Sequence, residues 1–202
     1  MMNIKISTNM SGKMDGIHCI STNNINNPTC QSRRNIKGSV CEKCYAYNTA
    51  RRYPSLKNNL DHNSEVLSEL INDKDLPIIN DLYFRLEAFG ELINEYHAMN
   101  YINIAYKNPA VKFALYTKNI GILERAISII GKPDNLTVVQ SSLMINIPDA
   151  TVSPVADHLF TVYSKPYVSM NDIQINCGAK QCITCLKCYN KHTDMIINEQ
   201  LK

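Results

Sequence analysis

Several common features are missing from this sequence, and each absence excludes a class of protein. No apolar run approaches the roughly 18 residues that a membrane-spanning helix needs. Residues 1–10 are polar and lack the apolar stretch of a secretory signal. Charged residues make up 19% and hydrophobic residues 45%, which excludes a disordered chain. We therefore expect a cytoplasmic globular protein without a membrane segment, in which cysteines stay reduced.

The length of 202 residues suits a single domain with a substantial core. We divide the chain into three parts. A cysteine-bearing N-terminal segment covers residues 1–60, an α/β scaffold covers residues 61–165, and a cysteine-bearing C-terminal segment covers residues 166–202. Only the middle part shows regular hydrophobic periodicity, so we expect it to form the core.

Strand and helix patterns alternate through this scaffold. Helices are predicted at residues 63–72, 91–107 and 119–130, strands at 82–86, 111–116, 136–140, 151–153 and 159–163, and a last short helix near the C-terminus. This alternation predicts βαβ units and a parallel sheet. The strands are too few for an eight-stranded barrel. We therefore predict an α/β fold with a reduced or partial (β/α) barrel-like parallel sheet and cysteine-rich irregular termini.

The cysteines are the most informative residues, because they avoid the periodic part of the chain. Four lie within 26 residues near the start, four within 12 residues near the end, and none in the 132 residues between. Cysteines that only filled small spaces in a core would be spread along the helices and strands. We therefore interpret them as metal ligands: Cys19, Cys30, Cys41, Cys44, Cys177, Cys182, Cys185 and Cys188.

The C-terminal run carries the strongest signal, Cys177-x4-Cys182-x2-Cys185-x2-Cys188. Two nested CxxC steps are similar to the spacing with which bacterial ferredoxins hold a [4Fe–4S] cluster. In ferredoxins the outlying cysteine of such a run binds a second cluster, so these four thiols need not share one site.

The N-terminal cysteines give a weaker signal, Cys30-x10-Cys41-x2-Cys44, and Cys19 fits either a fourth ligand or a free thiol. The metal that we favour is iron, in one or two [4Fe–4S] clusters. Zinc is the main alternative, because two CxxC pairs can form a tetrahedral site of four thiolates. Such a site would use only four of the eight thiols. Disulfides are disfavoured by the expected reducing compartment.

Three further residues are candidates for contact with a cofactor. Arg85 and Lys118 lie where predicted strands end, which is where parallel sheets gather their active groups. Either side chain could hold a carboxylate or a phosphate, and an ion pair with Glu87 or Glu91 is the alternative. Tyr45 directly follows a cysteine and could exclude water from a cluster. The five histidines form no metal-binding spacing, so we expect each of them on the surface or in the core.

Positive charge is concentrated in residues 1–60, which contain nine Lys and Arg against two Asp and Glu, whereas the rest contains twelve against sixteen. Either a solvated face or an anionic partner accounts for this asymmetry. No nucleic-acid-binding motif is present, so nucleic acid is a partner without support from a motif. A small-molecule substrate and an electron donor are the other partners that we consider.

A series of short motifs resembles a family of phage and plasmid proteins, the gene-product-eighty-eight family. The motifs are, in order, Lys13-Met14-Asp15-Gly16, Cys30, Cys41 and Cys44-Tyr45-Ala46, Phe84-Arg85-Leu86 followed by Gly90, Tyr116-Thr117-Lys118, Ser141-Ser142, and the C-terminal run ending in Cys188-Tyr189. The resemblance spans nearly the whole chain and implies the cytoplasm of a bacterial host. Arg85-Leu86-Glu87 differs from the family's Arg-x-His stretch, and Tyr189 stands where the family has Trp.

This family looks distantly similar to radical S-adenosylmethionine proteins. That similarity implies that Cys30, Cys41 and Cys44 hold a [4Fe–4S] cluster whose fourth iron binds S-adenosylmethionine, and that the C-terminal run holds an auxiliary cluster. The usual CxxxCxxC spacing of such proteins is absent. Three classes of function stay open: a redox or radical enzyme, a non-enzymatic electron-transfer or sensor protein, and a zinc-stabilised binding module.

Overall fold

The structure is a computed structural model that describes residues 3–192 and 195–201. Its centre is a six-stranded sheet in which all neighbouring strands are parallel. The strands are β1 (His18–Ile20), β2 (Tyr83–Leu86), β3 (Lys112–Thr117), β4 (Leu136–Ser141), β5 (His158–Tyr163) and β6 (Ile196–Gln200). They lie side by side in chain order, as in a (β/α) barrel, but the sheet is open. The predicted α/β fold with a partial-barrel sheet is confirmed.

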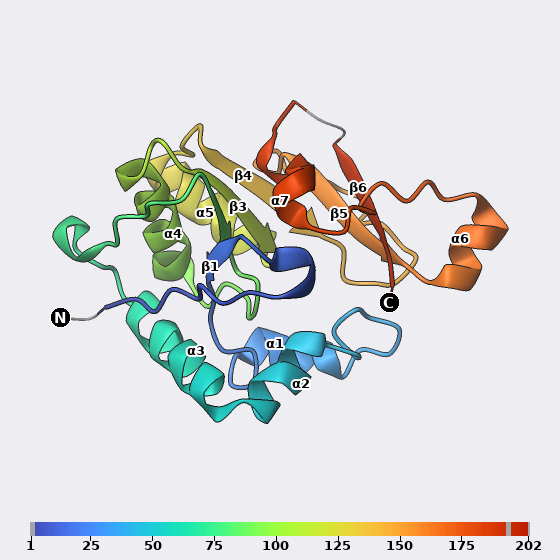
Figure 1. The fold of residues 1–202 in the computed structure, drawn as a ribbon, viewed down its shortest axis with the longest axis horizontal. Coiled ribbons are helices and arrows are strands. Elements are labelled where there is room, and N and C mark those ends of the chain that lie inside the picture. The colour runs from blue at the N-terminus through green and yellow to red at the C-terminus, as the bar shows by residue number, and fades with distance from the viewer. Residues whose placement is uncertain (1–2, 193–194, 202) are drawn as a thin grey trace.

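Helices surround this sheet (Figure 1). The α-helices are α1 (Pro28–Arg34), α2 (Tyr45–Arg52), α3 (Pro54–Leu67), α4 (Glu95–Lys107), α5 (Ile120–Ile130), α6 (Lys165–Asn171) and α7 (Cys182–Cys185), and the 3-10 helices are η1 (Gly12–Met14), η2 (Asp73–Asp75) and η3 (Lys187–Tyr189). Within the described part of the chain, no helix is both long and apolar enough to cross a membrane.

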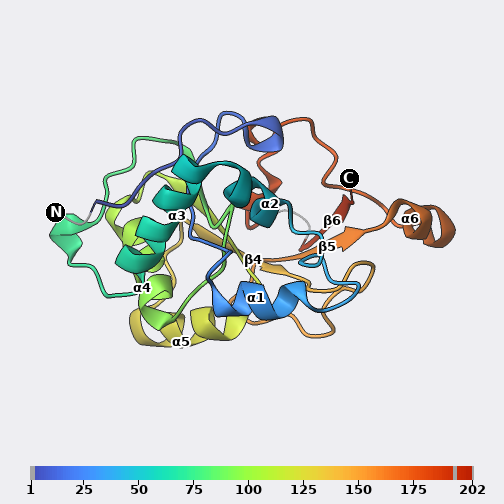
Figure 2. The ribbon, with the colours of Figure 1, turned by 90° about the horizontal axis from the view of Figure 1, so that it is seen from below.

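The two faces of the sheet are covered by different parts of the chain, because alternate side chains of a strand point to opposite faces. Phe84 and Phe113 belong to the large core cluster that also contains residues of α4 and α5. On the other face, Ala114 packs with Ile17 and Tyr189, next to α7 and η3. Figure 1 shows α7 in front of the sheet, and in Figure 2 α5 lies on the opposite side. The C-terminal cysteines therefore face a side of the sheet that α4 and α5 leave free.

The segment that contains α1 and α2 lies at the carboxyl ends of the strands. The Val40 N–H group donates to the Leu143 carbonyl, just after β4, at 2.9 Å. Arg33 Nη2 donates to the carbonyl of Lys118, just after β3, at 3.0 Å. In Figure 1, α1 and α2 lie below the sheet, on the side to which the arrow of β3 points. The first cysteines are thus placed where parallel sheets bind ligands.

The predicted last short helix is wrong, because the chain ends in β6 instead. Pairing with β5 explains the difference, since it supplies backbone hydrogen bonds to a segment too short to show a period of its own. The outer edge of β6 is covered as well: the Cys177 N–H donates to the Asn198 carbonyl at 3.0 Å, and the Asn198 N–H donates to Asn176 Oδ1 at 2.8 Å.

The predicted strand at residues 151–153 is also wrong, because these residues form a loop. Their backbone groups bond to one side chain rather than to a neighbouring strand. Gln140 Nε2 donates to the Thr151 carbonyl at 3.0 Å, and the Ser153 N–H donates to Gln140 Oε1 at 2.8 Å. A single amide thus replaces the ladder bonds that a strand would have made.

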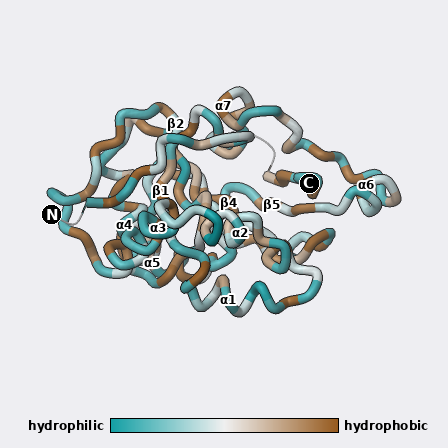
Figure 3. The backbone as a smooth tube through the Cα atoms, turned by 60° about the horizontal axis from the view of Figure 1, so that its bottom comes forward, coloured by the Kyte–Doolittle hydropathy of each residue, from teal (hydrophilic) through white to brown (hydrophobic). Residues whose placement is uncertain are grey.

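Two predicted helices have different limits. The helix expected at residues 63–72 is α3, which begins earlier, at Pro54. Its residues are predominantly hydrophilic (Figure 3), so its first turns give no apolar period. The helix expected from residue 91 begins at Glu95, because Asn94 caps it by accepting a hydrogen bond from the His97 N–H at 2.9 Å.

Candidate metal centre

The N-terminal cysteine set consists of Cys30, Cys41 and Cys44. Cys30 lies in the first turn of α1, where the cap residue Asn27 accepts a hydrogen bond from the Cys30 N–H at 3.2 Å. The same cap residue donates through Nδ2 to the Glu91 carbonyl at 2.9 Å, which fixes α1 to the sheet edge. Cys41 and Cys44 bracket one turn, in which the Cys44 N–H donates to the Cys41 carbonyl at 3.3 Å.

Acidic and basic side chains both affect the pKa values of the thiols in this N-terminal set. Burial raises the pKa of Cys30 to about 12, and the charges of Glu91 and Glu87 act in the same direction. Burial also raises the pKa of Cys41, but the ammonium group of Lys118 opposes this effect. These two thiols are therefore protonated in the metal-free protein near neutral pH. Metal binding must displace their protons.

The C-terminal cysteine set lies on the sheet face opposite to α4 and α5. Cys182 and Cys185 begin and end the single turn of α7, and Cys188 lies in η3. Between these helices Leu186 adopts a left-handed conformation, with φ at 53°. Its N–H donates to the Cys182 carbonyl at 2.9 Å and closes the turn. Cys177 precedes α7 and completes the set.

Polar side chains donate hydrogen bonds to two sulfur atoms of the C-terminal set. The Tyr116 hydroxyl donates to Cys188 Sγ at 2.7 Å. Lys13 Nζ donates to Cys177 Sγ at 3.6 Å, and it also forms an ion pair with Glu199. A donor directed at sulfur favours the thiolate form, which is the form that binds metal.

Arg85 lies within β2, beside the C-terminal set. Its guanidinium carbon is 3.2 Å from the centre of the Tyr116 ring. Burial raises the pKa values of Cys182 and Cys188, and the charge of Arg85 opposes the rise at both thiols. The structure thus places this predicted cofactor residue among the C-terminal cysteines.

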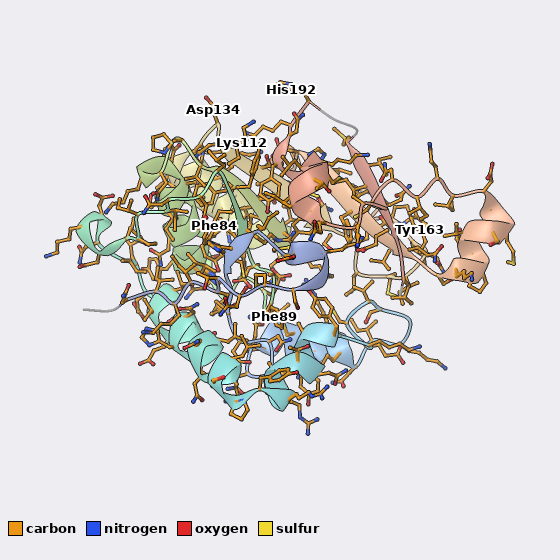
Figure 4. All side chains as sticks on the ribbon, in the orientation of Figure 1. Phe84, Phe89, Lys112, Asp134, Tyr163 and His192 are labelled. Atoms are coloured by element: carbon orange, nitrogen blue, oxygen red, sulfur yellow. The ribbon has the colours of Figure 1, made fainter. Side chains whose placement is uncertain are left out.

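The other two predicted cofactor residues lie at the N-terminal set. Lys118 directly follows β3, and its Nζ donates to Ser141 Oγ, at the end of β4, at 3.1 Å. Tyr45 follows Cys44, but its side chain is 68% exposed. Its hydroxyl donates to the Ala88 carbonyl at 3.0 Å, and its ring meets Phe89 edge to face at 5.8 Å. Figure 4 shows Phe89 below the sheet, next to α1 and α2.

Cys19 belongs to neither set. It lies in β1, opposite Arg85 in the register, and is 1% exposed. Its Sγ is 3.6 Å from Met10 Sδ and 3.6 Å from Ser21 Oγ. Burial raises the pKa of this thiol. Of the two readings that the sequence left open, a free thiol fits these surroundings better than a fourth ligand.

A buried polar network at the end of β2 was not predicted. Glu87 has φ at 56°, and its Oε1 accepts hydrogen bonds from the hydroxyls of Thr22 at 3.0 Å and Tyr101 at 2.7 Å. His97 Nε2 lies 3.2 Å from the same oxygen, off the line of a hydrogen bond. A Cβ atom at Gly90 would lie 2.7 Å from Glu87 Oε2, so glycine is required there. The signal for this network is that an acid, Glu87, and a histidine, His97, are both buried. The sequence alone does not show that burial.

All eight cysteines are free thiols. Across residues 3–192 and 195–201, no three His, Cys, Asp or Glu side chains lie close enough together to hold one metal ion. A tetrahedral zinc ion needs sulfur atoms about 2.3 Å from the metal. A [4Fe–4S] cluster holds its thiolates farther apart, because each of them binds a different iron atom. Free thiols are the ligand type that both kinds of centre use.

These features define a class of protein: a parallel α/β sheet with thiol-rich chain ends, one at its carboxyl edge and one on its free face. The chain belongs to the gene product 88 family, whose model matches residues 7–192. The family resemblance in the sequence is thereby confirmed, whereas its further similarity to radical S-adenosylmethionine proteins gains no support. Neither a curated protein nor a solved structure matches the chain.

Proposed function

We propose that the protein binds one or two [4Fe–4S] clusters, one on the N-terminal set and one on the C-terminal set. The observation that supports this proposal most is the gathering of seven free thiols into two sets on one sheet, while Cys19 stays buried apart. Side-chain donors directed at the sulfur atoms add support. Asn24 Nδ2, for example, donates to Cys44 Sγ at 3.7 Å.

The two sets differ in the number of thiols that they offer. Four cysteines of the C-terminal set could ligate every iron of one cluster, which then serves electron transfer. The three cysteines of the N-terminal set would leave one iron without a protein thiolate. Lys118 and Ser141, joined by a hydrogen bond of 3.1 Å, offer a cation and a hydroxyl at that edge. These groups suit a small molecule with a carboxylate. The specific molecule that we propose is S-adenosylmethionine.

The first experiment is the absorption spectrum of anaerobically purified protein, with iron, sulfide and zinc analysis. We expect a brown protein with about four or eight iron atoms per chain, as one or two cubane clusters contain. Cys41→Ser and Cys182→Ser should each remove one cluster, and Cys19→Ser should retain both. A colourless protein with stoichiometric zinc would contradict the proposal and favour the zinc-stabilised module.

A separate measurement decides between an enzyme and an electron carrier or sensor. The reduced, iron-loaded protein is incubated with S-adenosylmethionine, and cleavage of the sulfonium is followed. If the open-iron proposal is right, cleavage occurs and is lost in Cys41→Ser but kept in Cys182→Ser. An iron-loaded protein that leaves the compound intact would point to electron transfer or sensing.

A second candidate function is contact with single-stranded nucleic acid through α1 and α2. The guanidinium groups of Arg34 and Arg51 lie over the Tyr47 ring, 4.0 Å and 5.4 Å from its centre. Arg52 lies 5.7 Å from the centre of the Tyr53 ring. Cations interleaved with aromatic rings match the phosphate contacts and base stacking of single-strand binding.

Titration with a labelled oligonucleotide at several salt concentrations tests this candidate. We expect the affinity to fall steeply with salt, and the double variant Arg51→Ala, Arg52→Ala to bind more weakly with a shallower slope. Arg125→Ala, which changes an exposed arginine of α5 that is paired with Glu95, is the matched control. Equal binding by the control and the double variant would refute the candidate.

A further inference from the structure

Arg85 is a partly buried cation without an anionic partner among the described residues. Its Nε is enclosed and has no hydrogen-bond partner among the described residues, and none of their carboxylates forms an ion pair with it. Three other partly buried cations have acidic partners: Lys13 with Glu199, Arg33 with Glu91, and Lys132 with Asp157. Because shielding an unpaired charge from water is costly, the enclosed Nε of Arg85 favours an anion beside it.

The surroundings of Arg85 indicate where that anion belongs. Its guanidinium lies over the Tyr116 ring, and the Tyr116 hydroxyl donates to Cys188 Sγ at 2.7 Å. Cys182 and Cys188 pack against the cluster that contains Ala114, the neighbour of Arg85 in β3. The cation is thus surrounded by rings and sulfur atoms, which carry negative charge only when the thiols are deprotonated.

We infer that Arg85 is the counter-charge of a metal–thiolate centre on Cys177, Cys182, Cys185 and Cys188. This inference rests on the proposed function and extends it, because it assigns Arg85 to the C-terminal centre and not to the N-terminal one. The N-terminal set has its own cations, Lys118 and Arg33, whose charges oppose the rise that burial causes in the pKa of Cys41. Arg85 acts here as an electrostatic and positioning residue.

A fixed positive charge beside a cluster has a measurable consequence. Reduction adds an electron to a centre that is already anionic, so the reduced state gains more from a neighbouring cation than the oxidised state does. Removing the charge of Arg85 should therefore make the reduction potential of the C-terminal cluster more negative. It should also lower the amount of iron that this centre retains.

The test is a potentiometric titration of the full chain carrying Arg85→Met, followed by electron paramagnetic resonance. A parallel sample with Cys30→Ser, Cys41→Ser and Cys44→Ser assigns the signal to the C-terminal cluster. We expect a more negative potential and a lower iron content for Arg85→Met, and recovery of most of both by Arg85→Lys. Lys118→Met, which removes a cation at the N-terminal set, is the matched control. It should leave the reduction potential of the C-terminal cluster unchanged.

A second variant covers the case in which Arg85→Met does not fold. Tyr116→Phe keeps the ring under the guanidinium but removes the hydrogen bond to Cys188, and it should shift the same potential in the same direction. An unchanged potential in the folded variants, with the cluster still bound, would overturn the inference and leave the cluster proposal standing. A wild-type chain without iron and sulfide would overturn the proposed function, and the inference with it.

Discussion

One carboxylate oxygen, Glu87 Oε1, accepts two hydrogen bonds at the end of β2. Removing the hydroxyl of one donor measures how much such a bond contributes to stability. The Tyr101 hydroxyl, 2.7 Å away, keeps its proton, because burial raises its pKa well above the ordinary value of 10.0. Tyr101→Phe removes this donor from a buried acid. We expect the free energy of unfolding to fall by about 1–3 kcal/mol.

Tyr106→Phe, in the same helix, is the control for this substitution. Its side chain is 48% exposed, and its hydroxyl donates to the Ile130 carbonyl at 3.3 Å. Water can replace that bond, so the loss should be no more than a few tenths of a kcal/mol. Equal losses in urea unfolding of the two variants would show that the Glu87 contact does not matter.

The thiol of Cys30 gives the metal-free protein a pH dependence. Its pKa is about 12 in the folded state, against an ordinary value of 9.0 that applies to the unfolded chain. Between these values the folded state binds more protons, so its stabilisation is complete below pH 9.0 and is lost as the pH rises. The stability difference between wild type and Cys30→Ala should therefore shrink as the pH rises from 9.0 towards about 12 in urea unfolding. A difference that grows or stays constant would contradict this.

At the scale of elements, the cap of α1 connects the fold to the candidate centre. Asn27 accepts from the Cys30 N–H and donates to the Glu91 carbonyl, so it fixes both the helix and its cysteine. Asn27→Ala should lower the free energy of unfolding by about 0.5–2 kcal/mol. It should also lower the iron content, because Cys30 loses its anchor.

Asn94→Ala provides a matched control, because Asn94 caps α4 in the same way and donates to the Ser68 carbonyl at 2.8 Å. It should cost a similar free energy but leave the iron content unchanged, since α4 carries no cysteine. Iron analysis and thermal unfolding of both variants make the comparison. If both variants lose iron in proportion to their loss of stability, Asn27 has no specific role in anchoring Cys30.

Long periodic elements could be predicted from the sequence, whereas the shortest strand could not. The strand predicted at residues 136–140 is β4, in which all six positions are buried, and the helix predicted at 119–130 is α5. β1 has only three residues and was not predicted, because its strand state depends on pairing with β2. A window of that length holds too few residues to show a period.

The grouping of the candidate ligands along the chain could be read from the sequence, but their positions in the fold could not. Cysteine spacing separates the two sets, because ligands of one centre recur at short intervals. The spacing could not place the C-terminal set on the free face, since this depends on Tyr189 meeting Tyr83 edge to face at 5.4 Å. Nor could it place Cys19 in β1, because its burial there follows from the sheet.

At the scale of the whole molecule, the two cysteine sets are attached to one sheet at different places. The N-terminal set is attached to the carboxyl edge through Asn27 and Val40, and the C-terminal set is packed on the free face through Tyr189. A metal centre in each set would stabilise its own segment, because binding to the folded state adds to its stability.

Removal of metal should therefore loosen two separate regions and leave the rest of the scaffold unchanged. Hydrogen exchange followed by mass spectrometry compares the loaded protein with a sample stripped by a chelator under reductant. We expect faster exchange in residues 28–44 and 177–189, and no change in α4 and α5, whose core does not contain the thiols. In Cys182→Ser, only residues 177–189 should exchange faster. Uniform acceleration across α4 and α5 would instead mean that metal stabilises the fold as one unit.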